Sequence, residues 1–374
     1  MKVAYIAHNR IPTEKAHGIQ IMNTCSALAK HGAEVELVIP TRRNHIKVDS
    51  FVYYGIEKNF TIKKLFSFDL IRYGSLGYRI QHFSFIISTI LYGLRTRADI
   101  YYSRDETALL FLRWIGKRVV WETHEGRYNP STRLLIKRVA GIVGITKGLK
   151  DFYQEKGVPE QKIVVAHDAV DISQFNLPLS PQEARAKVGL PLNKKIVTYT
   201  GSLYLYKWKG VDVLLEAASY FGKEYVFVLV GGNEKEIAHI KEKYQNKNIM
   251  PVGHRPHKDI PFYLKASDVL VIPNKKGDII SERFTSPMKL FEYMASGVPI
   301  VASKLPSIEE VLSTRNAALV PPNDPGALAY GIKRLATDHD YTLKLRTQAF
   351  DDVRHYTWER RAQTIYSFLH SCIS

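Results

Sequence analysis

The residues with the clearest chemical pattern lie in the segment 281–307, "SERFTSPMKLFEYMASGVPIVASKLPS". Ser286 and Pro287 predict a helix start, because serine is a good N-cap and proline is tolerated at the first helical position. The unpaired amides and the dipole at such a start favour an anion, and Lys289 adds a cation nearby. Glu292 follows about one and a half turns later, where a carboxylate can accept hydrogen bonds from ribose hydroxyls. Singly these residues fit an ordinary capped amphipathic helix; together they predict a site for a diphosphate that carries a ribose.

Two further residues stand where predicted strands end. His124 follows the apolar run "RVVWET", and Gly201 follows "IVTYT". Ligands of open parallel sheets bind beyond the carboxyl ends of the strands, so both positions face a potential site. Gly201 lets the backbone come close to a phosphate. A single histidine is more often structural than functional. From the residues alone, His124 can therefore be either a structural residue or part of a site.

The hydrophobic pattern predicts a scaffold of alternating strands and helices. "KVAYIAH" and "AEVELVIP" are apolar strands, and "IQIMNTCSALAKHG" between them has helix periodicity. The alternation restarts at "IVTYTG" and continues through "PIVAS". The region 51–96 is rich in aromatic and basic residues, and we expect loops and one or two helices there. Such alternation indicates parallel sheets with helices on both faces.

The chain of 374 residues is long enough for two such domains. We expect the first over 1–175, a polar linker over 176–190 and the second over 191–355. A final helix over 356–374 is expected to pack back on the first domain. The predicted fold class is therefore α/β, with two doubly wound parallel sheets that face each other across a cleft, an arrangement that suits a reaction between two substrates.

The string from Ser286 to Ala302 resembles S-P-x-K-L-x-E-Y-M-A-x-G-x-P-I-V-A, which many retaining glycosyltransferases of family 4 carry. The resemblance extends along the chain. The segment 2–40 is similar to the family's opening strand, glycine loop and helix, 199–217 to the start of its donor domain, and 253–274 to the stretch before the donor motif. It implies the GT-B fold, two Rossmann-like domains across a cleft, and transfer of a hexosyl-type sugar from a nucleotide-sugar.

The resemblance gives Glu292 a role as the second acid of the family's E-x7-E motif, which holds the donor ribose. The first acid of that motif falls at Phe284. The chain departs from the pattern there, as does the SP-KL-EYMA subgroup that it resembles. Glu282, two residues away, is the candidate substitute.

Other donor-side positions also follow from the resemblance. Lys209 in "WKG" matches the lysine that contacts the donor diphosphate. The family's arginine after the strand-end glycine falls at Ser202, and Lys207 is the candidate for the missing charge. Arg255 matches the position where the nucleotide base packs. The expected donor site comprises Gly18, Gly201, Ser202, Lys209, Arg255, Ser286, Pro287, Met288, Lys289 and Glu292.

In the first domain, Gly18 in "AHGIQ" matches the glycine loop that approaches the donor phosphate and the reacting sugar. A plain turn into the helix is the alternative for Gly18. His124 matches a histidine that contacts the donor sugar, and is expected to be catalytic together with Lys209 and Glu292. Glu125 and Arg127 are the candidates on the acceptor side.

The resemblance further implies transfer with retention at the anomeric carbon, without a metal or another cofactor. Lys209, Lys289 and the amides after Ser286 would stabilise the departing diphosphate. No general base is obvious, which suits a reaction in which the leaving phosphate takes the acceptor's proton. The nearest match to a metal-binding Asp-x-Asp, "DHD" at 338–340, lies in the predicted helical tail.

Composition limits the classes of partner. The net charge is +17, and residues 1–150 hold 24 Lys/Arg against 11 Asp/Glu. Such an imbalance indicates an anionic partner: a nucleic acid, a lipid surface or a phosphorylated substrate. The two cysteines are far apart, which fits a reducing compartment and gives no metal-ligand spacing. The opening run is typical of a strand, and the longest apolar run, 83–94, is too short to span a membrane, so we expect a cytoplasmic protein.

The stretch 63–79 combines positive charge with aromatic rings. Its basic and aromatic residues are Lys63, Lys64, Phe66, Phe68, Arg72, Tyr73, Tyr78 and Arg79. This composition resembles an interfacial surface that attracts anionic lipid headgroups while aromatic rings dip in. It would suit a lipid-diphosphate-linked acceptor in envelope polysaccharide assembly, at the inner face of the membrane. A basic rim around a pocket for a soluble acceptor is the alternative.

Two other functions stay open: a nucleotide-sugar epimerase of GT-B type, and a non-enzymatic protein that binds an anionic ligand or a membrane. The sequence has no helix-turn-helix, RNA-recognition signature or zinc-ligand spacing, which argues against a nucleic-acid partner. The leading interpretation is a glycosyltransferase that uses a UDP- or GDP-linked sugar and a glycan or lipid-linked acceptor, in cell-envelope polysaccharide or glycoconjugate biosynthesis.

Overall fold

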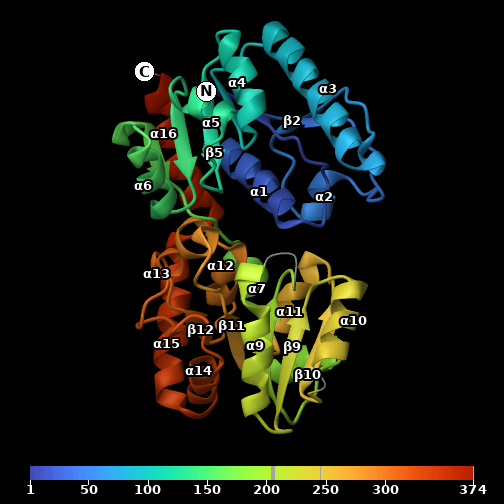
Figure 1. Ribbon diagram of the computed structural model, residues 1–374, viewed down its shortest axis with the longest axis vertical. Helices are drawn as coiled ribbons and strands as arrows, with labels where there is room; N and C mark the ends of the chain where they lie inside the picture. The colour runs from blue at the N-terminus through green and yellow to red at the C-terminus, as the bar shows by residue number, and fades with distance from the viewer. Residues whose placement is uncertain (204–206, 245, 374) are drawn as a thin grey trace. The chain divides into compact units, whose positions relative to one another are not determined.

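The computed structural model describes residues 1–203, 207–244 and 246–373, which form two compact α/β units (Figure 1). Unit 1 comprises residues 1–167 and the helix that begins at Trp358. Unit 2 comprises residues 168–357. The chain thus leaves the first unit once and returns to it for its last helix.

Within the described residues, unit 1 is built on a seven-stranded parallel sheet of order β3-β2-β1-β4-β5-β6-β7. Its strands are β1 (Lys2–Ile6), β2 (Glu34–Pro40), β3 (Thr61–Leu65), β4 (Ile100–Ser103), β5 (Val119–Thr123), β6 (Gly141–Gly144) and β7 (Ile163–Val165). In the central register, Val3 lies opposite Val35 of β2 and Ile100 of β4. Strands β4, β5 and β6 are buried along their whole length, as expected where helices cover both faces of a parallel sheet.

The helices of unit 1, apart from the last one, connect successive strands. They are α1 (Ala16–Lys30), α2 (Ser50–Tyr54), α3 (Gly74–Arg95), α4 (Glu106–Trp114), α5 (Pro130–Ile136), α6 (Lys147–Glu155) and α16 (Trp358–Ile373). Asp105 caps α4 and Asn129 caps α5, each accepting a hydrogen bond from a first-turn amide. Helix α16, red in Figure 1, packs on α1 although the two lie at opposite ends of the chain.

Unit 2 repeats the architecture with a six-stranded parallel sheet of order β10-β9-β8-β11-β12-β13 among the described residues. Its strands are β8 (Lys195–Thr200), β9 (Tyr225–Val230), β10 (Ile249–Gly253), β11 (Val269–Ile272), β12 (Ile300–Ser303) and β13 (Ala318–Val320). Val197 on β8 and Phe227 on β9 belong to one core cluster with Val271 of β11. Two doubly wound parallel sheets, predicted from the alternation of strands and helices, are therefore present.

The helices of unit 2 are α7 (Ile172–Phe175), α8 (Pro181–Val188), α9 (Val211–Ala217), α10 (Glu234–Lys243), α11 (Ile260–Lys265), α12 (Met288–Ala295), α13 (Pro306–Glu309), α14 (Pro325–Thr337) and α15 (His339–Asp352). Helix α8 lies in the segment 176–190 that we expected to be a linker. It begins with a capping box between Ser180 and Glu183. Its Arg185 is buried and donates to the carbonyl of Ala266, so this segment packs as part of unit 2.

Two short strands escaped the hydrophobic pattern. Strand β3, in the region expected to hold loops and helices, pairs with β2 at the sheet edge, and its side chains are exposed or half-buried. An edge strand of this kind lacks the apolar alternation that marks a strand in a sequence. Strand β13 is three residues long and lies between the predicted strand "PIVAS" and the predicted helical tail. Both are too short or too exposed to give a periodic signal.

Candidate active site

The helix that carries the strongest sequence motif begins one residue later than predicted. Helix α12 starts at Met288 with Pro287 as its N-cap, and no side chain of the described residues caps it. The expectation that Ser286 is the N-cap and Pro287 the first helical residue is therefore wrong. Ser286 is buried, and its Oγ accepts a hydrogen bond from the amide of Asp168 at 3.2 Å. The first turn of α12, which contains no acidic residue, keeps amides that can receive an anion.

Lys289 and Lys209, which we call the lysine pair, come together in unit 2. The Nζ of Lys289 donates to the carbonyl of Thr200 at 3.1 Å and lies 3.7 Å from the centre of the Tyr199 ring. Burial and the charge of Lys209 lower the pKa of Lys289 well below its ordinary value. Burial lowers the pKa of Lys209 to about 8, although Glu236 opposes the change. Burial disfavours the charge of both ammonium groups, and Lys209 further disfavours that of Lys289, so an anion bound here would stabilise the protonated forms.

The strand-end glycine follows β8 and lies close to Lys289. Gly201 has a φ of +127°, which favours glycine, and a Cβ there would lie 3.7 Å from the Nζ of Lys289. Ser202 follows it; its carbonyl accepts from the Tyr199 hydroxyl, and its Oγ has no hydrogen-bond partner among the described residues although it is buried. Lys207, the candidate for the missing arginine charge, is exposed. Gly201 therefore lies beside Lys289, and Ser202 beside Tyr199, whose ring Lys289 covers.

Helix α12 is fixed to β8 through a second contact. The hydroxyl of Tyr293 accepts a hydrogen bond from the amide of Thr200 at 2.8 Å. Thr200 is thus bound by α12 at both its amide and its carbonyl. This places the predicted phosphate helix and the strand-end glycine against each other, as the prediction of a common site requires.

Glu292 has a partner that the sequence did not indicate. Its Oε1 lies 2.8 Å from the Nε2 of His257, which belongs to the 3-10 turn His257–Asp259 after β10. Burial opposes protonation of His257, yet the hydrogen bond to Glu292 raises its pKa above the ordinary value. The sequence places His257 in "GHRPHKD", close to Arg255, but no periodic or motif signal selects it. Arg255 itself is exposed, and its Nε donates to the Tyr263 hydroxyl at 3.1 Å.

The residue at the position of the missing first acid, Phe284, packs in the interior of unit 2. Phe284 is buried at the end of a π-helical turn, Ile280–Phe284. Glu282 in the same turn accepts a hydrogen bond from the amide of Gly277 at 2.7 Å. Glu282 thus stabilises its own loop, and one of its carboxylate oxygens is committed to that contact. Met288, the first residue of α12, is half-buried.

Unit 1 has a separate cavity of about 290 Å³ at the carboxyl ends of its strands. Its walls include His8, His17, His82, Arg104, Asp105 and His124. His124 follows β5, as predicted, and its Nε2 lies 2.6 Å from the Oε1 of Glu122. The structure therefore places the expected catalytic histidine in the wall of a cavity and orients its ring with a carboxylate.

Glu122 is the centre of a buried polar network. It is fully buried, and its Oε1 lies 3.1 Å from the Nη2 of Arg361 on α16 and 2.6 Å from the Nε2 of Gln20 on α1. The hydroxyl of Tyr102 donates to its other oxygen. Burial alone would raise the pKa of Glu122, but Arg361 and His124 hold it well below the ordinary value. A glutamate inside the buried strand "VVWET" was a signal for such pairing, because a buried charge requires a partner.

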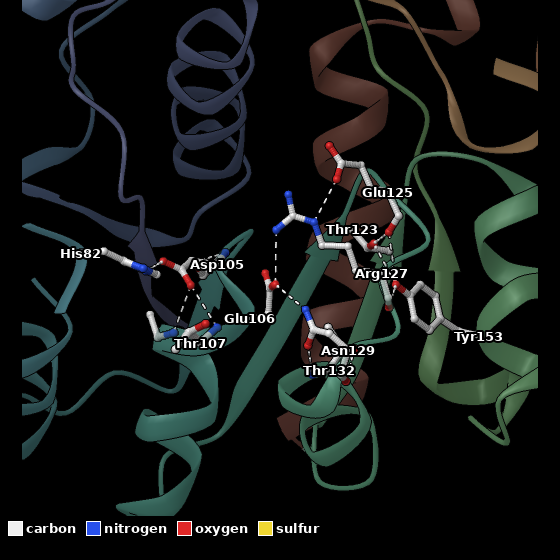
Figure 2. Close-up of polar contacts among 12 residues, drawn as sticks. His82, Asp105, Glu106, Thr107, Thr123, Glu125, Arg127, Asn129, Thr132 and Tyr153 are labelled. Atoms are coloured by element: carbon white, nitrogen blue, oxygen red, sulfur yellow. Dashed lines mark hydrogen bonds and ion pairs between the residues drawn. The ribbon is translucent and has the colours of Figure 1, made fainter. Parts of the chain in front are cut away.

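The two acceptor-side candidates form an ion-pair network at the same cavity (Figure 2). Arg127 lies between two carboxylates: its Nε donates to Glu125 at 2.9 Å and its Nη1 to Glu106 at 3.3 Å. Asn129 donates to the same oxygen of Glu106 at 3.5 Å. The Tyr153 hydroxyl donates to the carbonyls of Glu125 and Arg127. These contacts fix the loop after β5, which carries His124.

A cluster of His8, His82 and Asp105 lies in the wall of the cavity in unit 1. One oxygen of Asp105 caps α4, and the other lies 2.7 Å from the Nε2 of His82, as Figure 2 shows. Burial and His82 lower the pKa of His8 to about 4, whereas Asp105 raises that of His82 against the effect of burial. One potential ligand atom from each lies within 4.8 Å of the others, so that among the described residues this cluster has the geometry to hold a metal ion. Two imidazoles and a carboxylate are ligands that zinc accepts, so the expectation that no metal is used requires a test.

Gly18 is closely packed inside unit 1, where a larger residue would clash. A Cβ there would lie 2.2 Å from the hydroxyl oxygen of Tyr54 and 2.5 Å from the Cγ2 of Thr13. The Tyr54 hydroxyl in turn donates to the carbonyl of Thr13 at 2.8 Å. Gly18 lies within α1, and close packing against Tyr54 accounts for a glycine there; its approach to the donor stays a prediction.

Comparison with known proteins identifies the family. Residues 18–174 match the family model described as Glycosyltransferase Family 4, and residues 194–338 match the model described as Glycosyl transferases group 1. The chain is 22% identical to the D-inositol 3-phosphate glycosyltransferase of Corynebacterium urealyticum over 99% of its length and 96% of that protein. It is 26% identical to the putative colanic acid biosynthesis glycosyltransferase WcaL of Escherichia coli, over 61% of this chain and 55% of WcaL.

Solved structures share the whole architecture. The Anabaena protein Alr3699/HepE, crystallised with UDP and glucose, superposes with a TM-score of 0.76 at 18% identity, over 99% of this chain and 100% of that one. At this identity the likeness shows the fold. The two family models together span both units, and the chain is accordingly a glycosyltransferase of the GT-B type that belongs to family 4.

Proposed function

We propose that this glycosyltransferase transfers a hexosyl-type sugar, with retention at the anomeric carbon and without a metal ion, from a UDP- or GDP-linked donor. The observation that carries the proposal is the lysine pair, Lys209 and Lys289, whose pKa values are both lowered. With the uncapped start of α12, these side chains supply the positive charge that stabilises a leaving diphosphate.

The proposed donor site lies in unit 2. The diphosphate binds the lysine pair and the first-turn amides of α12, and the ribose hydroxyls bind the oxygen of Glu292 that His257 does not hold. Alr3699/HepE was crystallised with UDP and glucose, which makes UDP the first nucleotide to test. Arg255 beside Tyr263 is the proposed contact for the base.

In the proposed reaction, the bond between the anomeric carbon and the diphosphate oxygen breaks, and an acceptor hydroxyl bonds to the same face of that carbon. The acceptor's proton passes to the departing diphosphate, so the reaction needs no separate protein base. His124, oriented by Glu122, is proposed to contact the donor sugar, and Glu125 and Arg127 to line the acceptor side.

The proposed acceptor is a glycan or a lipid-linked sugar of cell-envelope polysaccharide or glycoconjugate synthesis, in the cytoplasm. The similarity to WcaL, a putative colanic acid biosynthesis enzyme, supports this class. No helix of the described residues is long and apolar enough to cross a membrane. For a lipid-linked acceptor, we propose peripheral contact between a membrane and the basic first unit.

The test is a screen of UDP-, GDP- and ADP-linked sugars for release of the nucleoside diphosphate, with and without EDTA. We expect slow hydrolysis of one donor that chelation does not change, and its loss in Glu292→Ala. Glu242→Ala, which alters an exposed acid on α10 of the same unit, is the matched control. His124→Ala should lower sugar release and leave binding of the nucleoside diphosphate intact.

Several outcomes would contradict the proposal. Equal rates of donor hydrolysis in the wild type and Glu292→Ala would show that the donor does not bind at α12. Loss of activity in EDTA would reject the metal-free mechanism. Conversion of the sugar-nucleotide into another, without an acceptor, would favour an epimerase.

A further inference from the structure

Helix α3 presents apolar side chains to solvent along its length. The exposed fractions of six of them run from 39% to 66%: Leu76, Ile80, Phe83, Ile87, Leu91 and Leu94. At 3.6 residues per turn these positions fall within an arc of about 80°, and they extend over about 27 Å of helix. They therefore form one continuous stripe.

The packing of unit 1 does not account for this stripe. The buried face of α3 mixes Phe85 and Ile86 with the polar residues Gln81, Ser84 and Thr89. An ordinary surface helix turns its polar residues outward and its apolar residues to the core. On α3 polar groups are buried and the outward arc is apolar, so the fold of unit 1 does not explain why these side chains are apolar.

The loop after β3 extends the stripe. Phe66 and Phe68 are 61% and 54% exposed, and their rings pack against each other at 4.9 Å. The loop is held along α3: the Ser88 hydroxyl donates to the carbonyl of Phe66 at 2.8 Å, and the amide of Phe68 donates to Ser84 at 3.0 Å. We call the six stripe residues, Phe66 and Phe68 together the α3 surface.

The surroundings of the α3 surface are cationic. The sequence of α3 contains no aspartate or glutamate. The exposed cations next to it along the chain are Lys63, Lys64, Arg72, Arg79, Arg95 and Arg97. The nearest acids in sequence already have partners: Asp69 pairs with Arg42 at 3.6 Å, and Asp99 accepts from the amide of Lys2. The positive charge is thus left for an external partner.

We propose that the α3 surface docks unit 1 on an anionic lipid bilayer. The stripe lies flat in the interfacial layer, with its apolar side chains among the acyl chains and the arginines and lysines at the headgroups. The role of this docking rests on the proposed function: a helix held at the bilayer would bring a lipid-linked acceptor to the enzyme.

A second copy of the chain fits this surface less well. Pairing two α3 surfaces would bring their flanking cations together, in a chain whose net charge is already +17. Like charges at such an interface oppose association. An anionic bilayer satisfies both the apolar stripe and the cations.

The experiment is flotation of the full chain with vesicles of phosphatidylcholine alone or with phosphatidylglycerol. We expect binding to the anionic vesicles that weakens in high salt. Phe83→Ser with Leu91→Ser should reduce the bound fraction at least about tenfold, since two large apolar side chains no longer leave water. The matched control is Tyr330→Ser with Leu343→Ser, which changes two exposed apolar residues of unit 2 and should float like the wild type.

A second variant tests the charges without touching the stripe. Arg79→Glu with Arg95→Glu should abolish the preference for phosphatidylglycerol. Absence of flotation by the wild type, or equal flotation of Phe83→Ser with Leu91→Ser, would overturn the inference. So would a wild-type dimer, seen by sedimentation, that becomes monomeric in that variant and never binds vesicles. Flotation needs no sugar donor, so binding of UDP by calorimetry shows separately whether the proposed transferase function stands.

Discussion

The lowered pKa values of the lysine pair predict that nucleotide binding is coupled to proton uptake. Burial lowers the pKa of Lys209 to about 8, and burial together with Lys209 lowers that of Lys289 well below its ordinary value. Near pH 8 the free site therefore carries less than its full charge. A bound diphosphate favours the protonated form of each ammonium, so binding raises both pKa values. We expect UDP to bind with uptake of protons from solution.

The size of the effect follows from Lys209 alone. With a pKa of about 8, roughly half of the molecules hold a neutral Lys209 at pH 8 and roughly a tenth at pH 7. UDP binding should therefore take up about half a proton at pH 8 through this lysine, and Lys289 adds uptake of the same sign. As the pH rises above about 8, the affinity should fall by as much as about tenfold per pH unit for each lysine.

The assay is titration calorimetry in buffers that differ in ionisation enthalpy, from about pH 7.5 to 9.5, where the phosphate of UDP, with its second pKa near 6, is fully ionised. Lys209→Arg keeps the positive charge at every pH used, so it should lose the share of the pH dependence that Lys209 contributes. Lys241→Arg, on an exposed face of α10, is the matched control and should behave like the wild type. If the wild type takes up no protons in this range, the reasoning about the lysine pair is refuted.

Two other predictions concern unit 1. Gly18→Ala should lower the melting temperature by several degrees, because its Cβ would lie 2.2 Å from the hydroxyl oxygen of Tyr54. Adding Tyr54→Ala to this variant should recover part of the loss. A melting curve identical to the wild type would contradict the prediction and show that α1 can shift. Glu122 has a lowered pKa in the folded state, so its stabilising contribution is present above the unfolded pKa and is lost as the pH falls. Arg361→Met leaves a buried carboxylate without its cation, so it should lower the free energy of unfolding in denaturant by about 3–5 kcal/mol at neutral pH. The difference should become smaller as the pH falls below about 4. A free energy of unfolding equal to that of the wild type at neutral pH would reject the ion pair as a source of stability.

The fold could be predicted because its signal is local. Apolar strands such as β9 and β11 and the helices between them appear as periodic runs in the sequence. The strand-end positions of His124 and Gly201 follow from the same runs, because parallel strands place their carboxyl ends at one edge. The exact start of α12 did not follow, since Ser286 uses its hydroxyl to hold Asp168 instead of capping the helix.

The missing parts of the site depend on contacts between distant segments. Arg361 and Glu122 are far apart in the chain, and they meet only because α16 packs on α1 and its side chain reaches β5. His257 meets Glu292 through a short turn that has no periodicity of its own. Residues of this kind become visible only after the sheets are assembled. A buried acid inside an apolar strand, as at Glu122, is the one hint that a sequence offers in advance.

Helix α3 shows how an apolar pattern can be noticed in a sequence without revealing what its side chains contact. The apolar run 83–94 is too short to span a bilayer, and taken alone it fits a helix whose apolar residues face the core of unit 1. The structure buries Phe85 and Ile86 from this run but leaves Phe83, Ile87 and Leu91 exposed. Periodicity gives the spacing of the apolar residues on a helix, but only tertiary packing decides which of its faces meets the core. Because both sides of α3 carry apolar residues while the packing of unit 1 buries one of them, the described residues of unit 1 leave the other side exposed to a partner.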